Sequence, residues 1–343
     1  MINRETLPDI YISFFLFTTD MKPGDELYRA TVVKHITELQ KFGYSGFEFP
    51  IAPPNNTPNY EQDLENYTCL RNHLDSNGLS DVKIATNVGT TRTFDPSSPY
   101  PEQQNKALEY LKSRVDITDA LGGEIMMGPI VIPYGVFPTT DFNEPIWSDQ
   151  LQDLLAERYQ QAQPILNELG EYAECKNVKL AIEPITHWET PGLNKLSQLI
   201  EFLKGVSNKH VGVVIDSAHE TLDGDGPEIF KTQVTELVTD QRLHYIQVSP
   251  PDRGALHTSW LPWQPFLQTI LKDNSYQEPI AVEIFNAIPA FLNSLRLTRR
   301  KFWIPGEDPE SCQYPNAYTI AEEAFKATKR EIEKVINLKS NLN

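Results

Sequence analysis

Four short apolar runs in the second half of the chain each end in an oxygen-bearing side chain. Those side chains are, in chain order, Glu183, Asp216, Gln247 and Glu283. Continuous runs of Val, Ile and Leu are typical of parallel strands that helices bury on both faces. If such strands close into a ring, their carboxyl ends meet at one mouth, where the active sites of barrels lie. We therefore expect three carboxylates and one amide to meet at that mouth.

Three carboxylates held close together repel one another unless a cation lies between them. Hard oxygen donors suit Mn²⁺ or Mg²⁺, and Co²⁺ is a workable substitute. A lone acidic residue at a strand end is weak evidence, because such residues also cap helices. Here the interval between successive members matches one strand-helix-strand step each time. The pattern predicts one bound divalent ion, with Mn²⁺ as the first choice.

Strand-like runs alternate with helix-like stretches along the whole chain, which is typical of an α/β fold. Together with the four runs above, the first half completes a count of eight strands, so we predict one (β/α)8 barrel. The expected strands of the first half are 10–17, 46–49, 82–86 and 124–127, and the expected helices are 25–42, 60–76, 102–121 and 149–174.

The pattern changes near the carboxyl end of the chain. We expect the barrel to occupy residues 1–302 and a C-terminal extension to occupy residues 303–343. A charged, amphipathic helix is expected from Ala317 to Leu338. Because an amphipathic helix must cover its apolar face, the extension should pack on the barrel as part of the same domain or form an oligomer contact.

Composition limits the location and the partners of the protein. A net charge of −17 over 343 residues argues against a nucleic-acid partner, since binding phosphates normally requires a basic face. Cys69, Cys175 and Cys312 are widely spaced and odd in number, which favours a reducing compartment. The apolar run 10–17 is too short to span a membrane and follows acidic residues. We expect a cytoplasmic protein without a membrane partner, and a homo-oligomer is left open.

Three further polar residues lie just past the strand ends. Glu189 closes the segment Glu-Pro-Ile-Thr-His-Trp-Glu that begins at Glu183, and His219 closes Asp-Ser-Ala-His. Arg253 follows Gln247 in Gln-Val-Ser-Pro-Pro-Asp-Arg-Gly. With these residues the sequence resembles the xylose isomerase-like barrels, and among them the tagatose and allulose (psicose) 3-epimerases, with inosose isomerases and dehydratases as near relatives. The resemblance covers roughly Ile10 to Ala290 and is specific mainly in the second half.

The resemblance implies a metal site and a catalytic pair. In that family Glu, Asp, His and Glu hold the ion, and the matching residues here are Glu183, Asp216, Gln247 and Glu283. Gln247 departs from the pattern: its amide oxygen can bind a hard cation, but it is neutral and does not titrate. Glu183 and Glu283 match the two carboxylates that remove and return a proton. Glu189, His219 and Arg253 match the positions that hold the oxygens at carbons 1 to 3 of a ketose.

Other residues are weaker candidates for the site. His257 and Trp260 lie in the loop after the seventh strand and are expected to reach the substrate. His244 is an alternative metal ligand, but it lies three positions before Gln247 and so should point to the opposite face of the strand. The aromatic candidates for the pocket wall are Phe14, Phe15, Phe17, Tyr134, Phe137, Trp188, Trp260 and Trp263.

Several functions remain open from the sequence alone. The first is a metal-dependent isomerase or epimerase of a ketose, an inosose or a related polyol ketone. An inosose dehydratase shares the first half of that reaction, and a non-catalytic sugar-binding barrel is a third option because of Gln247. An endonuclease IV-type hydrolase is disfavoured by the seven scattered histidines and the acidic charge. Residues 284–289 contain no Gly-rich phosphate loop, which favours an unphosphorylated substrate.

Overall fold

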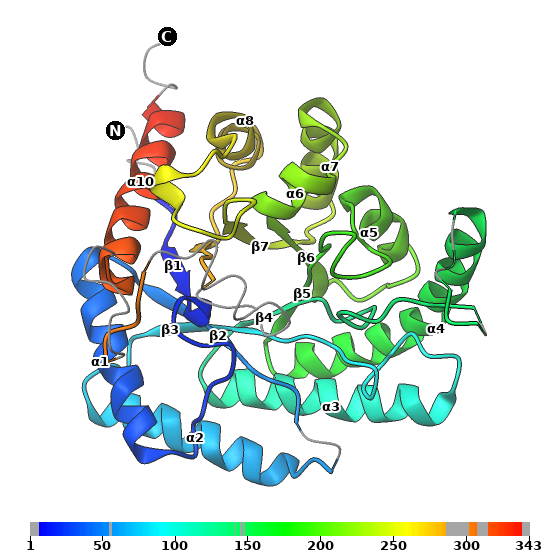
Figure 1. The fold of residues 1–343 in the computed structure, drawn as a ribbon, viewed down its shortest axis with the longest axis horizontal. Coiled ribbons are helices and arrows are strands. Elements are labelled where there is room, and N and C mark those ends of the chain that lie inside the picture. The colour runs from blue at the N-terminus through cyan, green and yellow to red at the C-terminus, as the bar shows by residue number, and fades with distance from the viewer. Residues whose placement is uncertain are drawn as a thin grey trace.

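Eight parallel strands form a closed ring in the computed structural model, as the sequence predicts (Figure 1). The structure describes residues 7–54, 57–140, 142–144, 146, 148–285, 302–306 and 315–337. Each strand pairs with the next, and β8 pairs with β1 to close the barrel. The strands are β1 Ile10–Ser13, β2 Gly46–Pro50, β3 Lys83–Asn87, β4 Ile125–Gly128, β5 Lys179–Ile182, β6 Val211–Asp216, β7 Leu243–Val248 and β8 Ile280–Val282.

Helices surround the ring and carry the chain from one strand to the next (Figure 1). They are α1 Glu26–Phe42, α2 Tyr60–Ser76, α3 Pro101–Ala120, α4 Ser148–Cys175, α5 Leu196–Leu203, α6 Ser217–Asp223, α7 Pro227–Thr239, α8 Trp263–Leu267 and α10 Ala317–Asn337. Capping side chains help to set where these helices begin. Asp25 Oδ1, for example, accepts hydrogen bonds from the N–H groups of Leu27 (2.8 Å) and Tyr28 (3.2 Å) and so caps α1. Within the described part of the chain, no helix is both long and apolar enough to cross a lipid bilayer.

Two hydrophobic clusters result from the alternation of side chains along the strands. One cluster fills the interior of the barrel, and the larger one lies between the ring and its helices. The interior cluster consists of Tyr11, Ala85, Ile125, Met127, Ala181, Val214, Tyr245 and Ala281. These side chains fill the barrel below the mouth. The polar side chains at the strand ends therefore lie above a layer of packed, largely apolar side chains.

The first strand is shorter than the sequence predicts. We expected it to reach Phe17, but β1 ends at Ser13 and a 3-10 turn, Phe14–Leu16, follows. The hydroxyl of Ser13 accepts a hydrogen bond from the N–H of Phe15 at 3.4 Å and so caps the turn. An apolar run alone does not distinguish a strand from such a buried turn.

Gly128 lets the backbone pass close to a neighbouring strand at the mouth. Its φ of 131° lies outside the range of ordinary residues, and an added Cβ would lie within 2.2 Å of the carbonyl oxygen of Val88. The carbonyl of the same glycine accepts a hydrogen bond from the N–H of Glu183 at 3.0 Å. This close approach therefore helps to place the backbone of Glu183.

Helix α10 lies beside α1 and contacts β1, β8 and α8 (Figure 1). The Tyr44 hydroxyl donates to the carbonyl of Ala321 at 2.8 Å, and the Tyr318 hydroxyl lies 2.8 Å from Nδ1 of His35. Ile332 and Val335 are buried on the same face of the helix. Helix α10 thus packs on the barrel within one chain.

Removing a buried side chain from α10 should destabilise the whole barrel. Ile332→Ala leaves a cavity under the helix, and we expect the free energy of unfolding to fall by about 2–5 kcal/mol. Thermal unfolding followed by circular dichroism measures the change, with the exposed Lys334→Ala as the control. Equal melting of Ile332→Ala and the control would show that α10 adds no stability to the barrel.

Candidate active site

The four polar residues predicted at the strand ends lie at one end of the barrel. Asp216 is the last residue of β6 and pairs in register with Gln247 of β7. Glu183 and Glu283 directly follow β5 and β8. The N–H of Glu283 donates to the carbonyl of Val248 at 3.0 Å, which fixes its backbone. All four side chains are buried, with exposed fractions of 6% or less.

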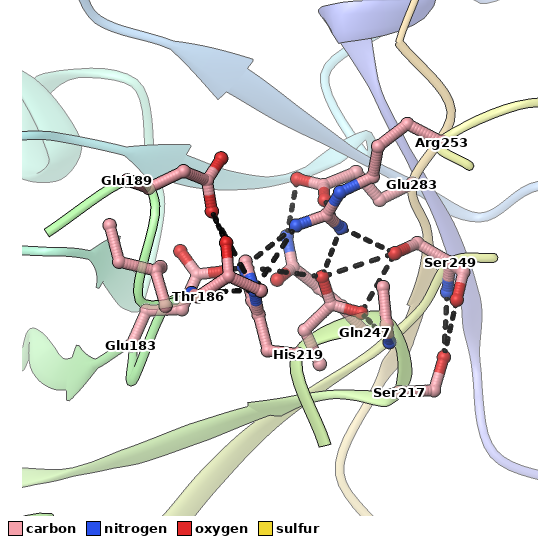
Figure 2. A network of polar contacts seen from close by, with 12 residues as sticks. Glu183, Thr186, Glu189, Ser217, His219, Gln247, Ser249, Arg253 and Glu283 are labelled. Carbon is pink, nitrogen blue, oxygen red and sulfur yellow. Dashed lines mark hydrogen bonds and ion pairs between the residues drawn. The ribbon is translucent and has the colours of Figure 1, made fainter. Parts of the chain in front are cut away.

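The guanidinium of Arg253 lies between two of these carboxylates (Figure 2). Nη1 donates to Asp216, to the hydroxyl of Ser249 at 2.5 Å and to Glu283 Oε2 at 2.9 Å. Nη2 lies 2.7 Å from Nε2 of His219. The backbone of Arg253 has a φ of 55°, in the left-handed region that costs a non-glycine residue energy. The surrounding contacts therefore hold this arginine in a strained turn that directs its side chain inward.

His219 connects the strand-end carboxylates to Glu189. Its Nδ1 accepts a hydrogen bond from the backbone N–H of Thr186 at 3.1 Å. Nε2 lies 3.2 Å from Glu183 Oε1, and Nδ1 lies 3.7 Å from Glu189 Oε2. Glu189 is held in place by the hydroxyl of Thr186, which donates to Oε2 at 2.6 Å.

Sequence reasoning missed one carboxylate of the site, Glu48 in β2. It is fully buried and accepts from Nε2 of Gln247 at 3.1 Å through Oε1 and at 3.0 Å through Oε2. The same Nε2 donates to Glu283 Oε1 at 3.0 Å. The signal was present in the sequence, because Glu48 stands between Phe47 and Phe49 in a run that otherwise predicts a buried strand.

Burial disfavours the ionised form of the carboxylates in the site. It raises the pKa of Glu48 to about 7. It also raises the pKa of Glu183, against the effect of His219 and Arg253, and the pKa of Glu283, against the effect of Arg253. Burial also acts to raise the pKa of Asp216, but the charges of Arg253 and His219 outweigh it and bring that pKa below its usual value. One guanidinium therefore compensates only part of the carboxylate charge.

The donor set fits a divalent cation. Oxygen or nitrogen atoms of Glu183, Asp216 and His219 all lie within 4.8 Å of one another. The Oε1 atom of Gln247 is buried and meets no hydrogen-bond donor among the described residues. An acceptor in that state is costly, about 1–3 kcal/mol, unless something else binds it. A hard cation would balance the carboxylate charge, and a buried amide oxygen is a ligand that such a cation accepts.

A cavity of about 360 Å³ opens above these residues, a size typical of small-molecule sites. Glu183, Glu189, His219, Arg253 and Glu283 all line it. Part of its wall is apolar and was not predicted from the sequence, namely Pro50, Ile51, Ala52, Pro53, Pro129 and Phe285. Of the aromatic candidates only Phe15 and Tyr134 belong to the lining.

Three predicted or alternative site residues lie elsewhere. His257 is exposed on a 3-10 turn, Leu256–Thr258, and Trp260 is 90% exposed; neither belongs to the cavity lining. His244 lies in β7 toward the opposite end of the barrel, where its Nε2 is 3.0 Å from the carbonyl of Lys209. Of residues 284–289, which we searched for a phosphate loop, residues 286–289 lie outside the described part of the chain.

Comparison with known proteins identifies the family of the chain. The chain belongs to the xylose isomerase-like TIM barrel family, which it matches over residues 36–301. It is 23% identical to the L-ribulose 3-epimerase of Methylomonas sp. (strain DH-1) over 66% of this chain and 73% of that protein.

Two solved structures are similar over nearly the whole chain. A candidate sugar phosphate isomerase/epimerase from Anabaena variabilis is 75% identical with a TM-score of 0.92, covering 96% of this chain and 100% of that one. The D-allulose 3-epimerase from Methylomonas sp., in complex with D-allulose, is 20% identical with a TM-score of 0.72, covering 95% and 97%. The second likeness shows the shared fold.

Removing the arginine charge should destabilise the metal-free protein in a pH-dependent way. In the wild type the pKa of Asp216 is below its usual value, so its ionised form stabilises the fold at neutral pH and this contribution is lost as the pH falls. Arg253→Met leaves the buried carboxylates unpaired. We expect a loss of about 3–5 kcal/mol near pH 7 that shrinks toward about pH 4, as protonation removes the unpaired charge.

Thermal unfolding across that pH range, in the presence of a chelator, measures the effect. Arg330→Met, which alters an exposed arginine, is the control. A loss of the same size at every pH would show that missing packing, and not unpaired charge, explains the destabilisation.

Proposed function

We propose that this protein is a divalent-metal-dependent isomerase or epimerase of an unphosphorylated ketose, inosose or related polyol ketone. The observation that carries the proposal is that Glu183 and Glu283 reach one cavity from strands that are not neighbours in the ring. Two carboxylates separated in this way can act on one substrate carbon from two directions. The family and its epimerase relatives support the same reaction class.

Under this proposal, Glu183, Asp216, Gln247 and Glu283 hold the cation. When bound, a divalent ion acts as a Lewis acid that stabilises negative charge developing on the substrate oxygens. Mn²⁺ is our first choice for an oxygen-rich set, followed by Mg²⁺ and Co²⁺. His219 lies 3.2 Å from Glu183 and 3.7 Å from Asp216, so it would lie beside a cation that these carboxylates held.

The protein's own carboxylates would move the proton. One of Glu183 and Glu283 removes the hydrogen from the carbon beside the ketone, giving an enediolate, and the other returns a proton to the opposite face. Burial raises the pKa of both side chains, which strengthens each as a base once it is ionised. Glu189, His219 and Arg253 line the same cavity and would hold the substrate hydroxyl and carbonyl oxygens.

The cavity suits an unphosphorylated substrate. Arg253 is the one Lys or Arg side chain in the described lining, and it is already paired with Asp216 and Glu283. A phosphate dianion would meet an excess of carboxylates there. We therefore favour a neutral sugar or polyol ketone, although the similar protein from Anabaena variabilis carries a sugar phosphate name.

Two alternatives would give different products. An inosose dehydratase would form the same enediolate and then lose water, and a non-catalytic barrel would bind a sugar without exchange. Incubation with a panel of ketoses in D₂O distinguishes them. Deuterium at the carbon beside the ketone without loss of water supports our proposal, loss of water supports the lyase, and no exchange with any ketose supports the binding protein.

Replacing the amide ligand with the family's usual residue should strengthen metal binding. Imidazole is a better ligand than a neutral amide for Mn²⁺ and Co²⁺, so Gln247→His should lower the Kd for Mn²⁺ by about tenfold. Titration followed by the paramagnetic resonance of free Mn²⁺ measures this directly. A Kd equal to that of the wild type would show that Gln247 does not bind the ion.

Removing either catalytic carboxylate should stop turnover and leave most of the metal bound. In Glu183→Gln and Glu283→Gln the amide keeps a ligating oxygen but accepts no proton, and we expect epimerisation to fall by roughly 10²- to 10⁴-fold. One of the two variants should still exchange a substrate proton with D₂O. The charge-matched control is Glu278→Gln, before β8 at the opposite end of the barrel. Near wild-type epimerisation by both metal-loaded variants would refute the two-carboxylate mechanism.

A further inference from the structure

The side chain of Gln247 spans the interior of the barrel. Its Nε2 donates to Glu48 of β2, and these two strands are separated in the ring by β8 and β1. Both partners are fully buried, and both belong to strands whose registers are fixed by their neighbours. The contact therefore joins two rigid elements across the mouth.

Chemistry assigns the orientation of this amide. Nε2 lies 3.0–3.1 Å from three carboxylate oxygens, two on Glu48 and one on Glu283. Its two hydrogens can serve all three if one of them is shared. When Glu48 and Glu283 are ionised, as ligation of a nearby cation favours, turning the amide over would bring Oε1 against those same oxygens, where each atom only accepts. The NH2 group is thus held toward Glu48, and Oε1 is left as the free end.

Among the described residues, no group donates a hydrogen bond to this free end, although Oε1 is buried. Buried acceptors are normally paired, so an unpaired one among the buried carboxylates of the site indicates a ligand. A metal-bound histidine often donates a hydrogen bond from its second ring nitrogen to a carboxylate, which fixes the orientation of the ring. In Gln247 the NH2 group makes the corresponding bond to Glu48, and Oε1 corresponds to the nitrogen that binds the metal.

We propose that Glu48 is a positioning residue that orients Gln247, so that Oε1 and not Nε2 faces the metal ion. This inference rests on the proposed metal dependence of the site. Asn87 supports the arrangement, because its Nδ2 donates to Glu48 Oε1 at 3.2 Å. Glu48 acts through Gln247 and does not itself need to touch the ion or the substrate.

The test measures the Kd for Mn²⁺ alone, without substrate, in four proteins: the wild type, Glu48→Gln, Gln247→Ala and the double variant. A glutamine at position 48 can donate as well as accept, so it no longer imposes one orientation on the neighbouring amide. We expect Glu48→Gln to weaken Mn²⁺ binding about tenfold. In the Gln247→Ala background the same change should alter the Kd by less than about twofold, because the group it orients is gone.

Each outcome decides a separate question. If Glu48→Gln weakened Mn²⁺ binding equally in the wild type and in Gln247→Ala, the inference would be overturned. Such a result would indicate a general effect of charge or folding, which does not depend on Gln247. Unchanged binding by Glu48→Gln would overturn it as well, while the proposed function would stand. A wild type that binds no Mn²⁺ would overturn both. Glu124→Gln, an exposed change just before β4, controls for the lost charge.

A folding defect would not leave the inference untested. If Glu48→Gln does not fold, Glu48→Asp keeps the negative charge but draws the acceptor oxygens away from Nε2 of Gln247. We then expect weaker Mn²⁺ binding at an unchanged net charge. Wild-type affinity in Glu48→Asp would show that the charge at position 48, and not its contact with the amide, is what matters.

Discussion

The structure depends on the burial of several carboxylates at one end of a closed barrel. Glu48, Glu183, Asp216 and Glu283 are each at most 6% exposed, and one guanidinium lies among them. Burying unpaired charge is expensive, so every nearby group must help to compensate. This requirement accounts for the strained backbone of Arg253 and for the orientation of the Gln247 amide. It is also why a cation fits the site so well.

The barrel itself could be predicted because its signals are local. Apolar runs, capping residues such as Asp25 and the spacing of the strand ends each act over a few residues, and they led to all eight strands. The failures were local too. The run that begins at Ile10 gives no sign that Ser13 ends the strand, because a buried turn and a buried strand have the same composition.

The site was harder to predict because its contacts join distant parts of the chain. The four strand ends were found, since a barrel brings such ends together by construction. Glu48 could be noticed locally as a charge within an apolar run, but its role could not, because its partner Gln247 is 199 residues away. The pairing of Arg253 with Asp216 and Glu283 likewise depends on how one turn folds. Loop residues such as His257 and Trp260 have no periodic pattern that would fix where they point.

The closure of the ring has a consequence for aggregation. A strand with a free edge can recruit another chain, and a closed barrel offers no such edge. The ring closes where β1 pairs with β8, a strand of only three residues. Helix α10 contacts both of these strands. The helix therefore covers the place where the ring closes, and it shields the two strands whose separation would create free edges.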